Sequence, residues 1–280
     1  MSQPIDRSYA LGAGLLILLL LAGLGLLWRL VLSRAARAQR PLPLLAPWPG
    51  TAADLLLFFL LAVCGAIALP AAGALALRST AVSDEARLVV GVVVLPHLGL
   101  LAGVAAFYLF FARGWVRPAA SPRSMLLGGV VTVLIALPLV QFTAIAWQGV
   151  LSLCHLPVET PDNVQMFMDL RSPVLRVLYA AAATLLAPVN EEILFRAGLF
   201  RYLRGRIPRW IALLLPALIF GLLHLTRAPL ESLSELAPLV VLGVILSLAY
   251  ERTGRIGTAI VAHALFNLVT VVLVLLGVNA

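Results

Sequence analysis

The residues of this 280-residue chain best able to do chemistry are polar side chains inside apolar stretches of its second half. They form three short patterns: Glu191-Glu192-x-x-x-Arg196, Phe220-x-x-x-His224 and His263-x-x-x-Asn267. A charged side chain at the centre of a membrane-spanning helix costs about 2.5–3.5 kcal/mol on insertion scales. Pairing or function must offset that cost, so the three patterns predict a buried polar site.

The spacing within the first pattern gives its two glutamates different roles. Glu192 and Arg196 are four residues apart, which places them on one face of a helix and allows them to pair. Glu191 points about 100° away from Glu192 and can face another element. Pro188 lacks a backbone donor, so we also expect a kink or local unwinding beside the acidic pair.

The other two patterns use the same four-residue spacing to put two side chains on one helix face. A carboxylate close to a histidine can hold and deprotonate a water molecule, which suggests that Glu191 and His224 activate water. A neutral histidine and an asparagine amide both donate hydrogen bonds, so His263 and Asn267 could stabilise a developing oxyanion. Each of these residues alone is more often structural. Four of them in about a hundred apolar residues favour function.

The surrounding composition defines the elements that must position these residues. The chain is 62% hydrophobic and only 11% charged, which indicates an integral membrane protein. Apolar runs of about the twenty residues that a spanning helix needs predict an all-α bundle of about eight transmembrane helices, with the sixth and seventh short and the catalytic residues on the last four. The predicted spans are 10–30, 54–77, 88–111, 125–153, 173–195, 209–225, 237–250 and 256–278.

The net charge of +8 comes from arginines that gather in alternate loops. By the positive-inside rule these loops are cytoplasmic, so we predict a multi-pass protein of the cell (cytoplasmic) membrane with both termini on the non-cytoplasmic side. The basic residues therefore report topology and contact with the lipid bilayer, and we expect no nucleic-acid partner. The arginines follow the first, third, fifth and seventh spans: Arg29, Arg34, Arg37, Arg40; Arg113, Arg117, Arg123; Arg201, Arg204, Arg206, Arg209; Arg252, Arg255.

The two halves of the chain differ in character, and the polar segment 155–172 separates them. Residues 1–165 are predicted to form N-terminal transmembrane helices without a recognised motif, and residues 166–280 a domain that carries the chemistry. In the first half, Asp54 is expected to cap a helix start. His97 follows Pro96, and we expect its imidazole to satisfy a backbone group that the proline frees.

The three patterns, in this order on successive membrane segments, resemble the CAAX protease and bacteriocin-processing family of intramembrane endopeptidases, which includes the Ras-converting enzyme. The resemblance covers roughly residues 174–275. It implies that Glu191 is the catalytic base, that His224 shares the water, and that His263 and Asn267 form the oxyanion hole. Glu192, Arg196 and Phe220 would have supporting roles, and the substrate would be a membrane-associated protein or peptide.

A metal is a second possibility at this site. Glu191, His224 and His263 could supply three zinc ligands and leave one position open, although they lack the close spacing of most zinc sites. Other membrane-protease chemistries lack their motifs, because the sequence contains no H-E-x-x-H, no serine in a G-x-S context within a span and no G-x-G-D. We favour a metal-free reaction of water activated by glutamate and histidine.

Two other functional classes remain open. The same residues could form a polar packing network in a non-catalytic membrane scaffold or immunity protein. They could also belong to an ion or proton transporter, although no inverted repeat is evident. One prediction concerns depth: His224 is some fifteen residues from Arg209, so the sixth helix should begin outside the membrane, tilt, or break at Pro216.

Overall fold

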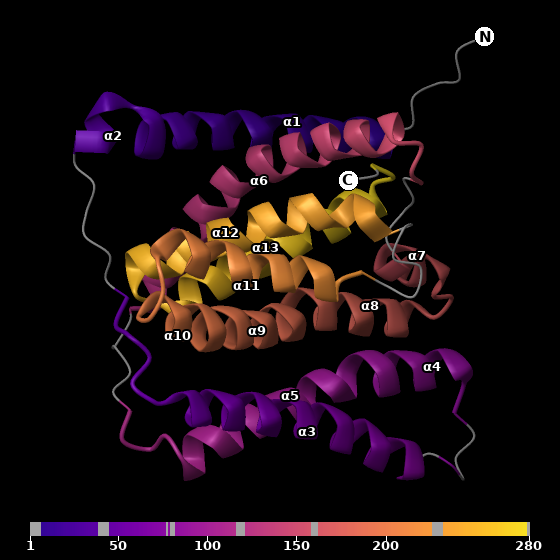
Figure 1. Cartoon of the computed structure of the whole chain (residues 1–280). Helices are drawn as coiled ribbons and strands as arrows, with labels where there is room; N and C mark the ends of the chain where they lie inside the picture. Colours follow the sequence, from indigo (N-terminus) through magenta and orange to yellow (C-terminus); the bar gives the residue numbers. More distant parts are fainter. Residues whose placement is uncertain are drawn as a thin grey trace. The chain divides into compact units, whose positions relative to one another are not determined.

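The computed structural model of this protein describes residues 7–38, 45–76, 78, 82–115, 121–157, 162–225 and 232–278. Its regular elements over these residues are all helices (Figure 1). The predicted all-α class is therefore confirmed. Of the loop residues used to assign topology, Arg40 and Arg117 lie outside the described residues.

Seven helices of the described chain are long and apolar enough to cross a membrane. The sixth predicted span is short as expected, because α11 (Arg209–Leu223) has only 15 residues. The prediction of a short seventh span is wrong: that helix runs for 22 residues because polar residues before the apolar run extend it. The seven long helices are Ala10–Leu32, Ala52–Ala76, Asp84–Phe110, Pro122–Leu153, Pro173–Arg204, Ser232–Thr253 and Ile256–Leu275.

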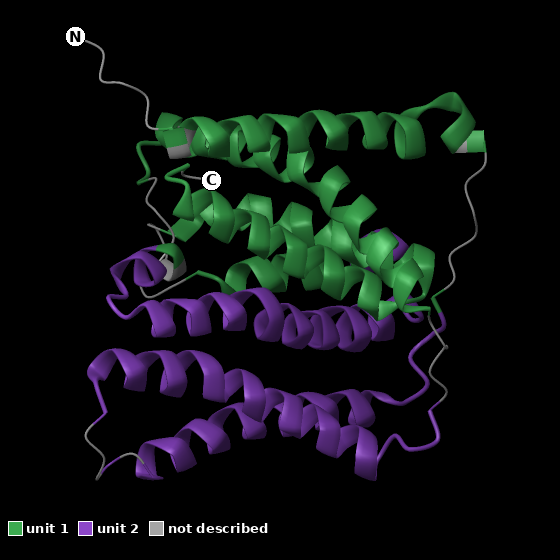
Figure 2. Cartoon of the chain, turned by 180° about the vertical axis from the view of Figure 1, so that it is seen from behind, with its two compact units in different colours: residues 1–45, 120–164, 213–280 green, residues 46–119, 165–212 purple. Residues whose placement is uncertain are grey.

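The chain divides into two compact units that are not consecutive in sequence (Figure 2). Unit 1 comprises residues 1–45, 120–164 and 213–280, and unit 2 comprises residues 46–119 and 165–212. The predicted division at residue 165 separates the part of the chain without a recognised motif from the part with the three motifs, and it stays a prediction.

Unit 2 is built on α3 (Ala52–Ala76) and α5 (Leu95–Phe110), which cross at glycines. A Cβ atom on Gly65 would lie 2.0 Å from the carbonyl oxygen of Gly99, so only glycine permits this approach. Small residues at helix crossings are typical of packing in lipid. Beside the crossing, Trp48, Phe58 and Phe107 form a buried aromatic cluster.

Hydrogen bonds within unit 2 tie loops that are far apart in the sequence. At one end, Arg201 donates to the carbonyl of Ala46 and Arg206 to that of Gly50, which ties two loops that were both predicted to be cytoplasmic. In another connection, Glu85 accepts hydrogen bonds from the backbone amides of Arg171 and Ser172, which ties two loops predicted to lie on the opposite side. These contacts agree with the predicted pairing of loops.

Asp54 stabilises the N-terminus of α3 in unit 2. Asp54 forms a capping box at the start of α3, because its carboxylate accepts from the backbone amide of Thr51 at 2.7 Å and Thr51 accepts from the amide of Asp54. The predicted capping role of Asp54 is thus confirmed. The other elements of the unit are α4 (Asp84–Leu88), the π-helical η2 (Val89–Val94), the last five residues of α7 (Asp162–Asp169), α8 (Pro173–Ala181), η3 (Ala182–Leu186), α9 (Ala187–Glu191), η4 (Glu192–Phe200) and α10 (Arg201–Arg204).

Unit 1 is organised around α6 (Pro122–Leu153), which packs against α1, α12 and α13. Trp147 of α6 donates its indole N–H to the carbonyl of Leu233 at 2.7 Å. Arg255 donates to the hydroxyl of Ser124 at 2.5 Å and joins two further connections predicted to be cytoplasmic. The other elements are α1 (Arg7–Leu27), η1 (Trp28–Leu32), α2 (Arg34–Ala38), η5 (Ser232–Glu235), α12 (Leu236–Thr253) and α13 (Ile256–Leu275).

Candidate active site

The helix that carries the two glutamates departs from α-helical geometry on both sides of them. The five residues of α9 (Ala187–Glu191) lie between two π-helical segments, η3 (Ala182–Leu186) and η4 (Glu192–Phe200). Pro188 is the second residue of α9, directly after η3, and it donates no backbone hydrogen bond. The expected local unwinding beside the acidic pair therefore takes the form of π-helical turns, which often occur at functional sites.

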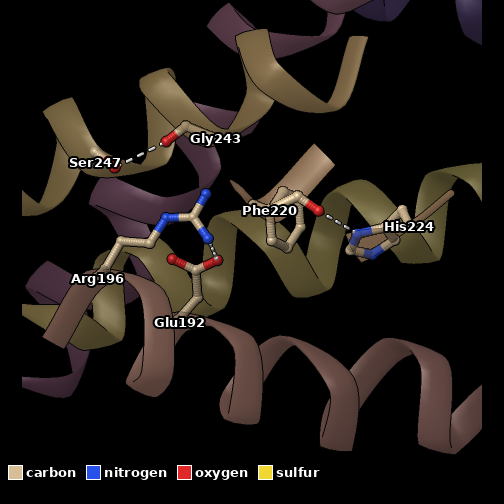
Figure 3. Close-up of polar contacts among 6 residues, drawn as sticks. All are labelled: Glu192, Arg196, Phe220, His224, Gly243 and Ser247. Atoms are coloured by element: carbon tan, nitrogen blue, oxygen red, sulfur yellow. Dashed lines mark hydrogen bonds and ion pairs between the residues drawn. The ribbon is translucent and has the colours of Figure 1, made fainter. Parts of the chain in front are cut away.

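Glu192 and Arg196 form the predicted ion pair (Figure 3). Their oxygen and nitrogen atoms are 3.0 Å apart, and the side chains of Arg196 and Glu192 are 1% and 0% exposed. Burial this complete makes pairing obligatory, because an isolated charge in an apolar interior would cost several kcal/mol. Glu191, by contrast, is only partly buried. The structure thus separates a tied glutamate from a more accessible one, as the spacing predicted.

His224 lies immediately after the end of α11 and is partly buried. Its Nδ1 atom is 2.7 Å from the carbonyl oxygen of Phe220 (Figure 3). A carbonyl oxygen only accepts hydrogen bonds, so Nδ1 must carry the proton in this contact. In the neutral imidazole, Nε2 then presents a lone pair. The helix runs through Pro216 without a break, so the option of a helix broken at that proline is wrong.

Phe220 links the two histidines of unit 1. Its ring is fully buried, with a centroid 4.5 Å from that of His224 and 6.0 Å from that of His263. The ring of His263 meets Phe220 edge to face, at an interplanar angle of 78°. The aromatic side chain therefore limits how both imidazoles can rotate, a more specific role than the general support expected from the sequence.

His263 and Asn267 occupy one face of α13, as their spacing predicted. His263 is 3% exposed and Asn267 is partly buried. Both side chains can donate hydrogen bonds to an oxygen atom that develops negative charge. The acidic turn with Glu191, Glu192 and Arg196 belongs to unit 2, and the other four predicted site residues belong to unit 1.

One polar pair near the acidic turn was missed by sequence reasoning. The side-chain amide of Asn190 donates to Nδ1 of His97 at 3.0 Å and to the carbonyl of His97, also at 3.0 Å. The expectation that the His97 imidazole satisfies a freed backbone group is wrong, because its Nδ1 accepts from a side chain 93 residues away. The available signal was Asn190 itself, an amide inside an apolar span.

A second missed feature is Glu251 of α12, a carboxylate that is 1% exposed. The neighbouring Tyr250 and Ser247 are also buried, and the hydroxyl of Ser247 donates to the carbonyl of Gly243 at 2.9 Å (Figure 3). The signal in the sequence was an acidic residue next to Arg252 at the end of an apolar run. From the sequence alone, that end of the run indicates only topology.

The zinc alternative needs three donor side chains close to one another. Among the residues that the structure describes, no three His, Cys, Asp or Glu side chains gather as they would around a metal ion. Zinc held by Glu191, His224 and His263 stays a prediction, and no step of the reaction is derived through a metal.

The fold and the polar residues together define a multi-pass, all-α membrane protein with ionisable groups on its later helices. Residues 173–269 match the family described as "Type II CAAX prenyl endopeptidase Rce1-like". All seven predicted site residues lie within this match. The resemblance predicted from the three motifs is confirmed over this segment, and the match supports a membrane protease of the CAAX type.

Two curated proteins are similar to parts of the chain. A Bacillus subtilis protein named "Putative membrane peptidase YdiL" is 29% identical over 112 residues, which cover 40% of this chain and 43% of that protein. An uncharacterised 24.3 kDa protein of Escherichia coli is 29% identical over 184 residues, or 59% of this chain and 80% of that protein. No solved structure matches the chain.

Proposed function

We propose that this protein is an intramembrane endopeptidase that hydrolyses peptide bonds of membrane-associated substrates with water activated by Glu191 and His224. The observation that carries the proposal is the occurrence of all three motifs, in order, within the segment that matches the CAAX endopeptidase family. The division of the glutamates into a buried, paired Glu192 and a more accessible Glu191 supports it further.

In the proposed reaction, Glu191 acts as general base. It removes a proton from a water molecule that donates its other hydrogen bond to Nε2 of His224, and the water oxygen attacks the carbonyl carbon of the scissile bond. The tetrahedral intermediate carries its negative charge on the former carbonyl oxygen, where His263 and Asn267 donate hydrogen bonds. Collapse of the intermediate breaks the C–N bond, and the proton held by Glu191 passes to the leaving amine.

The hydrogen bond of His224 favours this role for the imidazole. Because Nδ1 contacts the carbonyl oxygen of Phe220, the neutral ring exposes its lone pair at Nε2. That atom can accept a hydrogen bond from water without any change of tautomer. The buried ring of Phe220 holds the imidazole on a second side, so the acceptor is oriented before water or substrate arrives.

The ion pair of Glu192 and Arg196 supports a secondary role for this glutamate in the proposed reaction. A carboxylate committed to a buried guanidinium is a poor base, because protonating it would leave the arginine charge without compensation. The ion pair also anchors the first turn of η4, directly after Glu191. Glu192 therefore supports the position of the base rather than replacing it.

The membrane helices and the family match support a proposed location and substrate class. We place the protein in the cell membrane, with both termini on the non-cytoplasmic side and the site reached from a water-filled cavity open to the cytoplasm. The substrate is a membrane-associated protein or peptide, cleaved near its C-terminus. Zinc bound by Glu191, His224 and His263 is the competing chemistry, and we favour the metal-free reaction.

Comparing the N-termini of membrane proteins in cells with the wild-type protein and with Glu191→Ala tests the proposal. We expect new N-termini that depend on Glu191 and lie at the membrane surface. Asp54→Asn is a matched control, since it alters an acidic residue whose observed contacts cap a helix. Identical N-termini in wild type and Glu191→Ala, together with ion flux through proteoliposomes, would instead favour transport.

A further inference from the structure

The strongest unexplained feature of the molecule is the hydrogen-bonded pair of Asn190 and His97 in unit 2. Asn190 lies in α9, directly before Glu191, and is 1% exposed. His97 lies in the first turn of α5. The two contacts join the acidic turn to a helix that carries none of the three family motifs.

Two hydrogen bonds hold the side-chain amide of Asn190 against His97. Both hydrogen bonds from Nδ2 of Asn190 reach the same residue, one to the ring atom Nδ1 and one to the backbone carbonyl, each at 3.0 Å. Because Nδ2 is a donor, Nδ1 of His97 must accept, and the neutral ring carries its proton on Nε2.

Stability alone is a weak explanation for this pair. The amide oxygen of Asn190 is buried and has no hydrogen-bond partner among the residues that the structure describes. A buried polar atom left in this state costs about 1–3 kcal/mol, whereas replacing both partners of a buried polar pair by apolar side chains of similar shape can be neutral or stabilising. Two leucines would therefore pack the same helices at lower cost.

The local helix geometry explains what a contact between Asn190 and His97 can do. Only five α-helical residues separate the two π-helical segments around Glu191, so the rotational setting of this turn is not fixed by one continuous hydrogen-bond ladder. A contact to a second helix can fix it. Asn190 and Glu191 are adjacent, so holding the amide against α5 also determines the direction in which the Glu191 carboxylate leaves the helix.

We propose that His97 and Asn190 are positioning residues, which set the orientation of Glu191 by clamping the acidic turn to α5. This inference rests on the proposed function of Glu191 as the base. Neither residue touches the reacting atoms in this role. Their loss should affect the chemical step more than substrate binding, because the base is displaced while the substrate-binding groups stay in place.

The test uses the full-length protein in detergent or liposomes with His97→Leu, Asn190→Leu, the double variant and His97→Asn. The last variant keeps an acceptor, Oδ1, close to the position of Nδ1. With a substrate identified from the N-terminal comparison, we expect the leucine variants to lower kcat about 10–100-fold with KM unchanged. His97→Asn should recover most of kcat.

Measurements of stability distinguish positioning from a structural tie. Thr184→Val is the matched control, because Thr184 is a buried polar residue of the same span whose hydroxyl bonds its own helix at Ala180. We expect the control to keep wild-type kcat, and the double leucine variant to unfold at the wild-type temperature or above it. A double variant that fails to fold would identify the pair as a structural tie and overturn the proposal, as would wild-type kcat in both leucine variants.

A second readout separates this inference from the proposed function. Dicyclohexylcarbodiimide modifies carboxyl groups in apolar surroundings, and peptide mass spectrometry measures its reaction with Glu191. The leucine variants should change the labelling rate of Glu191 and leave that of Glu85, near the start of α4, unchanged. Full protease activity in Glu191→Ala would refute the proposed function. An inactive Glu191→Ala combined with unchanged kcat and Glu191 labelling in His97→Leu would refute only the positioning role.

Discussion

Breaking the Glu192–Arg196 pair should strongly destabilise the protein, and removing both charges should not. The atoms are 3.0 Å apart and the two side chains are almost completely buried, so Arg196→Met leaves a carboxylate in an apolar interior without its guanidinium. Removal of one partner from such a pair typically costs about 3–5 kcal/mol, whereas an apolar replacement of both is often neutral or stabilising. The double variant Glu192→Leu/Arg196→Met should therefore recover most of the loss.

Unfolding in mixed micelles of dodecyl maltoside and sodium dodecyl sulfate, followed by tryptophan fluorescence, measures this effect. Trp48 is a suitable reporter because it is 3% exposed and lies in the hydrophobic core against which Ile193 and Leu199 of η4 also pack. A complete double-mutant cycle isolates the coupling between the two charges from their other contacts. The reasoning would be refuted if each single variant lost less than about 1 kcal/mol, or if the double variant lost the sum of both.

Three further predictions concern the oxyanion donors, the helix crossing and the metal. Asn267→Ala should lower kcat about 10²–10³-fold and retain traces of activity, and steady-state kinetics showing wild-type kcat would contradict its role. Gly65→Ala should destabilise unit 2 in thermal unfolding, since a Cβ would meet the Gly99 carbonyl at 2.0 Å, while Gly91→Ala, with no atom within 4 Å, should not. Dialysis against 1,10-phenanthroline should leave activity unchanged, and loss restored by zinc would favour the metal alternative.

Local spacing was sufficient for some parts of the site. The pair of Glu192 and Arg196 could be predicted because residues four apart meet on any helical turn, including the π-helical one observed here. The same is true of Phe220 with His224 and of the shared face of His263 and Asn267. The family resemblance also came from these local patterns, and the match over residues 173–269 confirms it.

Contacts between distant segments could not be predicted in this way. Pattern reasoning assigned His97 to its own backbone, yet it accepts from Asn190 on another helix. It gave Phe220 a general supporting role, yet the ring lies edge to face with His263. Pairings of this kind depend on which helices become neighbours, and apolar helices of similar length carry little sequence information about that choice.

The sequence by itself determined the membrane class, the helical fold and the separation of a tied glutamate from an accessible one. These follow from composition and from the helical period, which act over one or two turns. The tertiary structure alone decided the π-helical setting of the acidic turn, the clamp from Asn190 to His97 and the contact of one phenylalanine with two histidines. The clamp and the contact of Phe220 with His263 require side chains from separate segments to meet, and packing rather than periodicity brings them together.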